Sequence, residues 1–111
     1  MGGGMFMGLC AKLAGIRTFD EAMGLAAKGS QAHCDLTMSD IVGDELGARM
    51  PEINGARSFA LFGAFALNDS SREASVEPAD LARSLVYMMS FHLSELTYLF
   101  YQIEVHCDKY F

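Results

Sequence analysis

The residues of this chain that most plainly suggest chemistry are three consecutive glycines near its start, Gly2, Gly3 and Gly4. Glycine lacks a Cβ atom, so its backbone can adopt positive φ angles and approach an anion closely. The glycines run directly into a segment with helical apolar spacing, and the free N–H groups of a helix start bind phosphate. We therefore predict that Gly2, Gly3 and Gly4 bind the phosphates of a nucleotide. A flexible N-terminal glycine tail is the alternative interpretation.

Other side chains suggest metal binding less strongly. The pairs His33-Cys34 and His106-Cys107 contain the donor types that zinc prefers. Adjacent side chains diverge on helices and strands alike, so ordinary core or surface positions are the favoured interpretation. Asp35 and Asp40 could approach a metal, but helix capping explains them more economically. We assign no catalytic residue and no metal ligand within the chain.

The glycines must be positioned by the helices that follow them. Phe6, Leu9, Cys10 and Leu13 form one apolar stripe, and Gly15 is a suitable terminator of that helix. A second helix begins at a Thr18–Glu21 capping box and buries Phe19, Ala22, Met23 and Ala26. Helices are predicted over about 5–14, 18–28, 55–67 and 78–101, with a short helix or turn over 35–42. Loops are predicted over 44–54 and 68–77, and the start of a strand over 105–111.

The helix predicted from Pro78 to Tyr101 is apolar nearly all round. Pro78 suits the first helical position, and Asp80 places a negative charge in the first turn. A helix with apolar residues on every side is normally buried on several sides. His92 and Glu95 on this helix are interpreted as packing or subunit-contact residues rather than catalytic ones. The helix therefore predicts an interface with a further domain or subunit.

Composition limits the class of protein. The chain has 111 residues, of which 51% are hydrophobic, including eight Met and eight Phe, so disorder is not expected. Its net charge of −6 argues against nucleic acid as a partner. Three cysteines without paired spacing suit a reducing compartment, and neither a signal peptide nor a transmembrane segment is recognisable. We expect a cytoplasmic protein.

Several short motifs together resemble the eukaryotic-type (type II) pantothenate kinases. They are Gly2-Gly3-Gly4-Met5-Phe6-Met7-Gly8-Leu9-Cys10, Thr18-Phe19-Asp20-Glu21-Ala22, Ala26-Ala27-Lys28-Gly29, Asp35, Asp40-Ile41-Val42-Gly43, Phe62-Gly63 and Asp80-Leu81-Ala82-Arg83-Ser84-Leu85. The resemblance covers nearly the whole chain. It implies an α/β, ribonuclease-H-like fold of the acetate and sugar kinase, Hsp70 and actin superfamily. This chain would be a mostly helical part of the second, nucleotide-binding lobe.

The resemblance also implies an activity. It implies ATP- and Mg²⁺-dependent phosphorylation of pantothenate, the first step of coenzyme A biosynthesis, with feedback from acyl-CoA. Gly2, Gly3 and Gly4 would lie at the nucleotide, and the Pro78–Tyr101 helix would belong to a homodimer interface. The family has threonine after its third glycine, where this chain has Met5, and serines where Ala60 and Leu61 stand. A hydroxyl that could bond a phosphate is therefore replaced by a thioether.

Parts of the family pattern fall outside this chain. The first phosphate-binding hairpin, the catalytic acid and most pantothenate contacts precede the segment equivalent to Gly2, and the end of the adenosine site follows Phe111. We therefore expect a kinase fragment that is inactive alone. A second hypothesis is a non-catalytic interaction protein that pairs with a full-length pantothenate kinase through the Pro78–Tyr101 helix. A third is an unrelated small helical domain.

Overall fold

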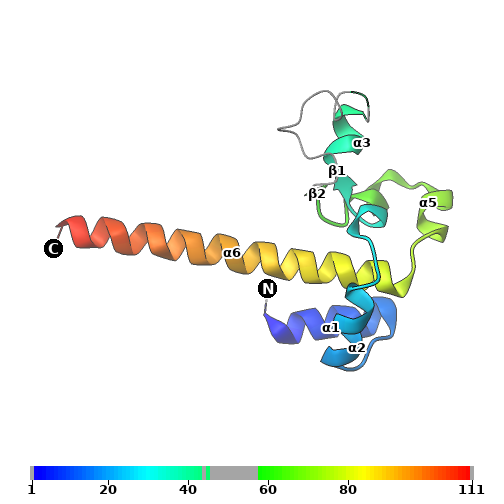
Figure 1. Cartoon of the computed structure of the whole chain (residues 1–111), viewed down its shortest axis with the longest axis horizontal. Coiled ribbons are helices and arrows are strands. Elements are labelled where there is room, and N and C mark those ends of the chain that lie inside the picture. Colours follow the sequence, from blue (N-terminus) through cyan, green and yellow to red (C-terminus); the bar gives the residue numbers. More distant parts are fainter. Residues whose placement is uncertain (1, 44, 46–57, 111) are drawn as a thin grey trace.

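One long helix organises the molecule. The computed structural model describes residues 2–43, 45 and 58–110. Helix α6 (Pro78–Tyr110) runs the length of the molecule, and its first half carries the other elements (Figure 1). The described residues are mostly helical, with five α-helices and two short strands. This agrees with the prediction of a mostly helical chain.

Helices α1 (Gly3–Ala14) and α2 (Phe19–Ala26) both pack on the first half of α6. Figure 1 shows α1 running beside α6 in the opposite direction. Apolar side chains from the three helices and the α1–α2 turn form one buried cluster, namely Phe6, Cys10, Ile16, Ala22, Ala26, Ala82 and Leu85. We call α1, α2 and the first half of α6 the three-helix unit. Its core fixes the direction in which α1 begins.

The ends of α1 and α2 follow local chemistry. Gly15 ends α1 at φ 70°, where its N–H donates to the carbonyls of Ala11 and Cys10, as its identity predicts. Thr18 caps α2 by accepting a hydrogen bond from the Glu21 N–H at 3.2 Å, which confirms that half of the capping box. The Glu21 carboxylate accepts from the N–H of Arg17 at 3.5 Å rather than from Thr18.

A smaller unit lies beside the start of α6. The 3₁₀ turn η1 (Gln31–His33) leads into strand β1 (Leu36–Thr37) and helix α3 (Met38–Val42). Strand β2 (Ser58–Ala60) pairs antiparallel with β1, and the 3₁₀ turn η2 (Gly63–Leu67) follows it. Helix α5 (Ser70–Ala74), capped by Asp69, then leads to α6. We call β1, α3, β2 and η2 the β unit.

Three predicted elements differ from the structure. The helix predicted over 55–67 is, in its described part, strand β2 followed by the η2 turn, because residues 58–60 pair with β1. The loop predicted over 68–77 contains α5. The strand predicted from residue 105 is instead the continuation of α6, since neither Gly nor Pro interrupts the helix before Tyr110. The loop predicted over 44–54 lies, apart from Glu45, outside the described residues.

One burial prediction is also wrong. Phe19, predicted on the buried face of α2, is 54% exposed, and its ring meets Phe6 edge-on at the margin of the core, with centroids 6.3 Å apart. The second half of α6, where the sequence predicts an interface with a further domain or subunit, is exposed in this chain over almost all of residues 90–106. Its exposed apolar side chains are Phe91, Leu93, Leu96, Tyr98, Leu99, Phe100, Tyr101, Ile103 and Val105.

Candidate functional site

The predicted phosphate site is the N-terminus of α1. Gly2 is its N-cap with φ −101° and ψ 174°, and Gly3 and Gly4 form the first helical turn. The expected left-handed glycine turn is therefore absent here: the positive-φ glycines among the described residues are Gly15 and Gly43. Glycine is not needed at 2–4 for backbone conformation.

This helix start is open to solvent and carries no capping side chain. Gly2, Gly3 and Gly4 are exposed, and no acidic residue lies in the first turn. The first four N–H groups of an α-helix have no partner within the helix, and the macrodipole adds a partial positive charge at this end. A Cβ added at Gly2, Gly3 or Gly4 would meet no atom within 4 Å. The backbone N–H groups at this helix start can donate hydrogen bonds to a phosphate oxygen.

The rest of the chain holds α1 in place through the three-helix unit. Phe6 and Cys10 are fully buried, and each lies in the same cluster as Ala82 and Leu85 of α6. Burial raises the pKa of the Cys10 thiol, and its burial agrees with its predicted place on the apolar stripe of this helix. The position of the first turn therefore depends on apolar packing one to two turns further along α1.

A second group of polar residues lies where the β unit meets α6. Asp35 is fully buried, and its Oδ1 accepts hydrogen bonds from the Ser84 hydroxyl at 2.5 Å and the Phe62 N–H at 2.9 Å. Phe62 adopts the left-handed conformation, with φ 57°. This conformation is costly for an aromatic residue. The hydrogen bond that the Phe62 N–H donates to Asp35 helps to hold the backbone of this turn in that conformation. Among the described helices, the one that follows Asp35 is capped by Thr37, so the described part of the chain does not bear out the capping interpretation of Asp35.

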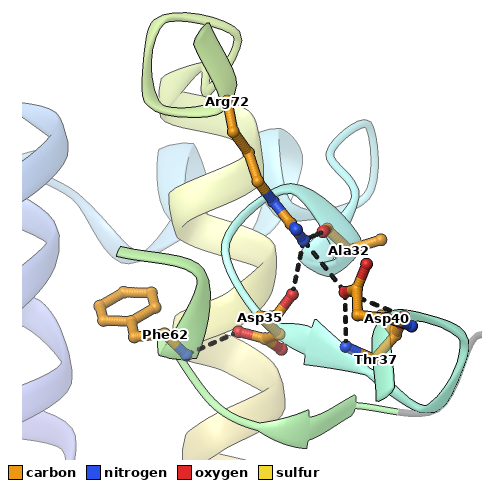
Figure 2. A network of polar contacts seen from close by, with 6 residues as sticks. All are labelled: Ala32, Asp35, Thr37, Asp40, Phe62 and Arg72. Atoms are coloured by element: carbon orange, nitrogen blue, oxygen red, sulfur yellow. Dashed lines mark hydrogen bonds and ion pairs between the residues drawn. The ribbon is translucent and has the colours of Figure 1, made fainter. Parts of the chain in front are cut away.

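Arg72 of α5 bonds to residues of the same polar group (Figure 2). Its Nη2 donates to the carbonyls of Ala32 and Asp35 and to Asp40 Oδ2, at 2.9, 3.0 and 3.2 Å. Asp40 also forms a capping box with Thr37 at the start of α3, as the capping interpretation predicted. The hydrogen bond from the Thr37 N–H has the largest effect on the pKa of Asp40 and lowers it, and Arg72 lowers it further. Burial raises this pKa but does not cancel the other two effects.

Asp80 connects the start of α6 to η1. Its carboxylate accepts from the Ser30 N–H at 2.9 Å and the Glu77 N–H at 3.1 Å, and it lies 2.8 Å from His33 Nδ1. Burial raises the pKa of Asp80, but the hydrogen bonds from His33, Ser30 and Glu77 outweigh it and lower the pKa overall. The sequence predicts a charge in the first turn, and the structure adds a contact to residues some fifty positions away.

The zinc interpretation receives no support from the described part of the chain. His33 contacts Asp80, and Cys34 is fully buried, where burial and then the nearby Asp35 and Asp80 raise the pKa of its thiol to about 12. A thiol with so high a pKa is a poor metal ligand. Residues 2–43, 45 and 58–106 contain no cluster of three His, Cys, Asp or Glu side chains that could hold a metal ion.

Sequence reasoning missed Arg72 and Ser84. Both act through partners far away along the chain: Ser84 bonds a residue 49 positions away, and Arg72 bonds residues 32 to 40 positions away. A signal existed for Ser84, which is a hydroxyl between the apolar positions Ala82 and Leu85 on the buried side of α6. A buried hydroxyl normally has a hydrogen-bond partner. Arg72 carried no comparable signal.

Comparison with known proteins settles the family. The model of the Fumble family matches residues 1–111. The chain belongs to the Fumble family. It is 34% identical to pantothenate kinase 1 of Arabidopsis thaliana over 101 residues, which are 89% of this chain and 25% of that protein. It is 38% identical to 4'-phosphopantetheine phosphatase of Mus musculus, over 90% of this chain and 12% of that protein.

A fungal relative gives the same result. Pantothenate kinase of Schizosaccharomyces pombe is 30% identical over 89% of this chain and 24% of its own length. The chain therefore spans a quarter or less of these relatives. The predicted resemblance to pantothenate kinases is confirmed. Separately, no helix among the described ranges has both the length and the apolarity that a membrane span requires.

Proposed function

We propose that this chain is part of an ATP-dependent pantothenate kinase, which phosphorylates pantothenate in the first step of coenzyme A biosynthesis. The observation that carries the proposal is the family match over residues 1–111, together with relatives named pantothenate kinase in a plant and a yeast. A ribonuclease-H-like fold for the whole enzyme, regulation by acyl-CoA and a cytoplasmic location belong to the same proposal. The chain's own part would be to bind nucleotide, and we expect it to be inactive alone.

In this proposal the N-terminus of α1 faces the phosphates of ATP. Phosphoryl transfer depends mainly on positioning and on stabilising charge, and backbone N–H groups at a helix start supply both. Glycine at positions 3 and 4 forms a helix less readily than alanine would, and no described neighbour needs the space of a missing Cβ. Close approach of a phosphate group would account for glycine at these positions.

The residues around this helix start do not fit a metal ion. They offer N–H donors, which bind anions, and no acidic side chain lies in the first turn of α1. A Mg²⁺ ion that accompanies ATP would therefore need ligands other than the residues at this helix start.

Nucleotide binding can be tested on the whole chain by NMR titration with ATP. We expect the amide signals of Gly3, Gly4 and Met5 to shift, with a dissociation constant of about 1 mM or weaker. Gly4→Asp should abolish the shifts, because a carboxylate in the first turn repels phosphate. Gly24→Asp is the matched control, since Gly24 is an exposed glycine of α2. Shifts that are absent at α1, or unaffected by Gly4→Asp, would contradict the placement of the nucleotide.

The same preparation tests the expected lack of activity. Pantothenate phosphorylation by this chain alone should not exceed that of a reaction without protein. Turnover at the level of a complete kinase would show that the catalytic residues lie within this chain.

The second candidate is a non-catalytic interaction protein that pairs with a full-length pantothenate kinase. The specific observation in its favour is the second half of α6, where residues such as Phe100 and Tyr101 are 67% and 63% exposed. Large exposed apolar patches mark interaction sites in soluble proteins. Homodimerisation through the same helix is the corresponding proposal for the kinase itself.

A further inference from the structure

The connecting segment Ser30–Asp35 joins the β unit to the three-helix unit. At its upstream end, Gly29 lies so close to α6 that a Cβ there would overlap the carbonyl of Ala79. The Ser30 N–H then donates to Asp80 Oδ1 at 2.9 Å, and His33 Nδ1 lies 2.8 Å from Asp80 Oδ2. A single buried carboxylate on α6 therefore holds this end of the segment through two contacts.

The downstream end of the segment holds the β unit. The carbonyl of Cys34 accepts a hydrogen bond from the Ala64 N–H of η2 at 3.0 Å. The Asp35 carboxylate accepts from the Phe62 N–H, just before η2, and from Ser84 on α6. A weaker contact between residues 30–33 and α6 would therefore loosen the same segment that holds the β unit through Cys34 and Asp35.

His33 is the titratable side chain that contacts Asp80 in this arrangement. Its side chain is 51% exposed to solvent, whereas Asp80 is 8% exposed, so protons reach the imidazole readily. Neutral imidazole donates from Nδ1 in only one of its two tautomers, whereas imidazolium donates from both nitrogens and carries a positive charge. The contact with the Asp80 carboxylate is therefore stronger in the protonated form.

We propose that the His33–Asp80 contact is a pH-sensitive latch that fastens the connecting segment to α6 more firmly when His33 is protonated. The latch works while Asp80 is ionised. Because Asp80 has a lowered pKa in the folded chain, its contribution to stability is present above the ordinary carboxyl pKa and is lost only as pH falls below that value. The latch is thus tightest where Asp80 is ionised and His33 is protonated, and it loosens as the imidazole loses its proton.

Other charged groups around the latch come from three elements. Arg72 of α5 reaches the carbonyl of Ala32, next to His33, and so opposes a second positive charge there. Arg83 of α6 lies 3.5 Å from the carbonyl of Ala26, and Glu77 contributes its N–H just before α6.

Within the connecting segment itself, Cys34 has a pKa of about 12 and stays neutral, and Asp35 bonds Ser84 and Phe62. Asp80 contacts the imidazole directly, so its attraction outweighs the more distant Arg72.

The test measures amide hydrogen exchange of the whole chain at about pH 5.5 and about pH 8. Exchange rates are corrected for their intrinsic pH dependence. The probes are the N–H groups of Ser30 and Glu77, because both donate to Asp80. We expect about threefold greater protection at the lower pH, the size typical of a partly exposed ion pair. Equal protection at the two pH values in the unmodified chain would overturn the proposal without any variant.

Two variants assign the effect to one residue. His33→Gln keeps a hydrogen-bond donor but cannot titrate, so Ser30 and Glu77 should be protected equally at both pH values. His106→Gln is the matched control, because His106 is an exposed histidine of α6 far from Asp80, and it should keep the threefold difference. A pH dependence that survives His33→Gln would place the titrating group elsewhere and would also overturn the latch.

Discussion

At the scale of single residues, the most consequential atom group is the buried Asp35 carboxylate. It links three parts of the chain, because it belongs to the connecting segment and accepts hydrogen bonds from Ser84 on α6 and Phe62 before η2. A hydrogen bond to a charged acceptor contributes about 1.5–3 kcal/mol, and the loss of a buried partner leaves the acceptor less well satisfied. Ser84 is therefore worth more to the fold than its small size suggests.

We predict that Ser84→Ala lowers the free energy of unfolding by about 1–3 kcal/mol. The hydroxyl that donates to Asp35 is lost while the helical backbone is unaffected. Ser90→Ala on the same helix is the control, because Ser90 is exposed and alanine slightly favours a helix. Urea unfolding of both variants measures the difference. Equal effects of the two substitutions would show that the Ser84–Asp35 bond adds nothing to stability.

Residue roles could be predicted from the sequence where the partner is local. Gly15 and Thr18 act on groups three to five residues away, so their roles follow from residue type and spacing. Asp35, by contrast, finds partners 27 and 49 positions away, and no local pattern encodes such a pairing. The glycines do lie at a helix N-terminus, as the sequence predicts, but Gly2 is extended, Gly3 and Gly4 are helical, and none of the three is left-handed.

At the scale of elements, the connection between α2 and α6 depends on backbone contact. Gly29 follows α2 and lies directly against the carbonyl of Ala79 and the N–H of Asp80. Atoms of the main chain cannot move aside as a flexible side chain can, so the site admits no Cβ without a shift of one element. The Asp80 contacts to Ser30 and His33 lie within the same approach.

We predict that Gly29→Ala lowers the free energy of unfolding by about 2 kcal/mol or more, because the new methyl group overlaps main-chain atoms of α6. Gly24→Ala should do the opposite and raise it by up to about 1 kcal/mol. Gly24 is an exposed glycine of α2, and a methyl group added there would meet no atom within 4 Å. Thermal unfolding of the pair checks the prediction, and a stabilising Gly29→Ala would refute the close approach.

The predicted secondary structure is wrong in two places that have a clear physical cause. In one, a strand pairs with a distant part of the chain, and in the other, no helix-ending residue is present. Phe59, Phe62 and Phe65 recur every three residues, a spacing that fits a helix, yet residues 58–60 pair with Leu36–Thr37 as a strand. Val105 is β-branched and begins the segment predicted as a strand, but α6 continues through it. Without Gly or Pro after Pro78, the helix had no residue that would end it.

At the scale of the whole molecule, the fold is lopsided. The radius of gyration is 16.8 Å, against about 13 Å for a compact domain of this length. The packed residues gather around the first half of α6, and the second half extends away from them (Figure 1). About half of the side chains in that half are aromatic or aliphatic, and the large apolar ones are exposed, which favours association.

We predict that the chain self-associates through the second half of α6 and sediments with about twice the mass of one chain, the commonest oligomeric state. Leu96→Glu combined with Phe100→Glu should shift it toward the monomer, because buried unpaired charges oppose association. Ser90→Glu with Thr97→Glu is the control for added charge, since both positions are exposed and polar. Sedimentation velocity distinguishes the outcomes. A chain that stays monomeric at all concentrations would contradict homodimerisation through this helix.

The order of the elements along the chain has a consequence for biosynthesis. Helices α1 and α2 are made before α6, and the α6 residues on which they pack, such as Ala82 and Leu85, follow the end of α2 by roughly sixty residues. At a synthesis rate of about 5–20 residues per second, their apolar faces wait roughly 3–12 seconds for this partner. During that interval Phe6 and Cys10 lack the α6 side chains that bury them in the folded chain, so a chaperone can bind this segment before α6 covers it.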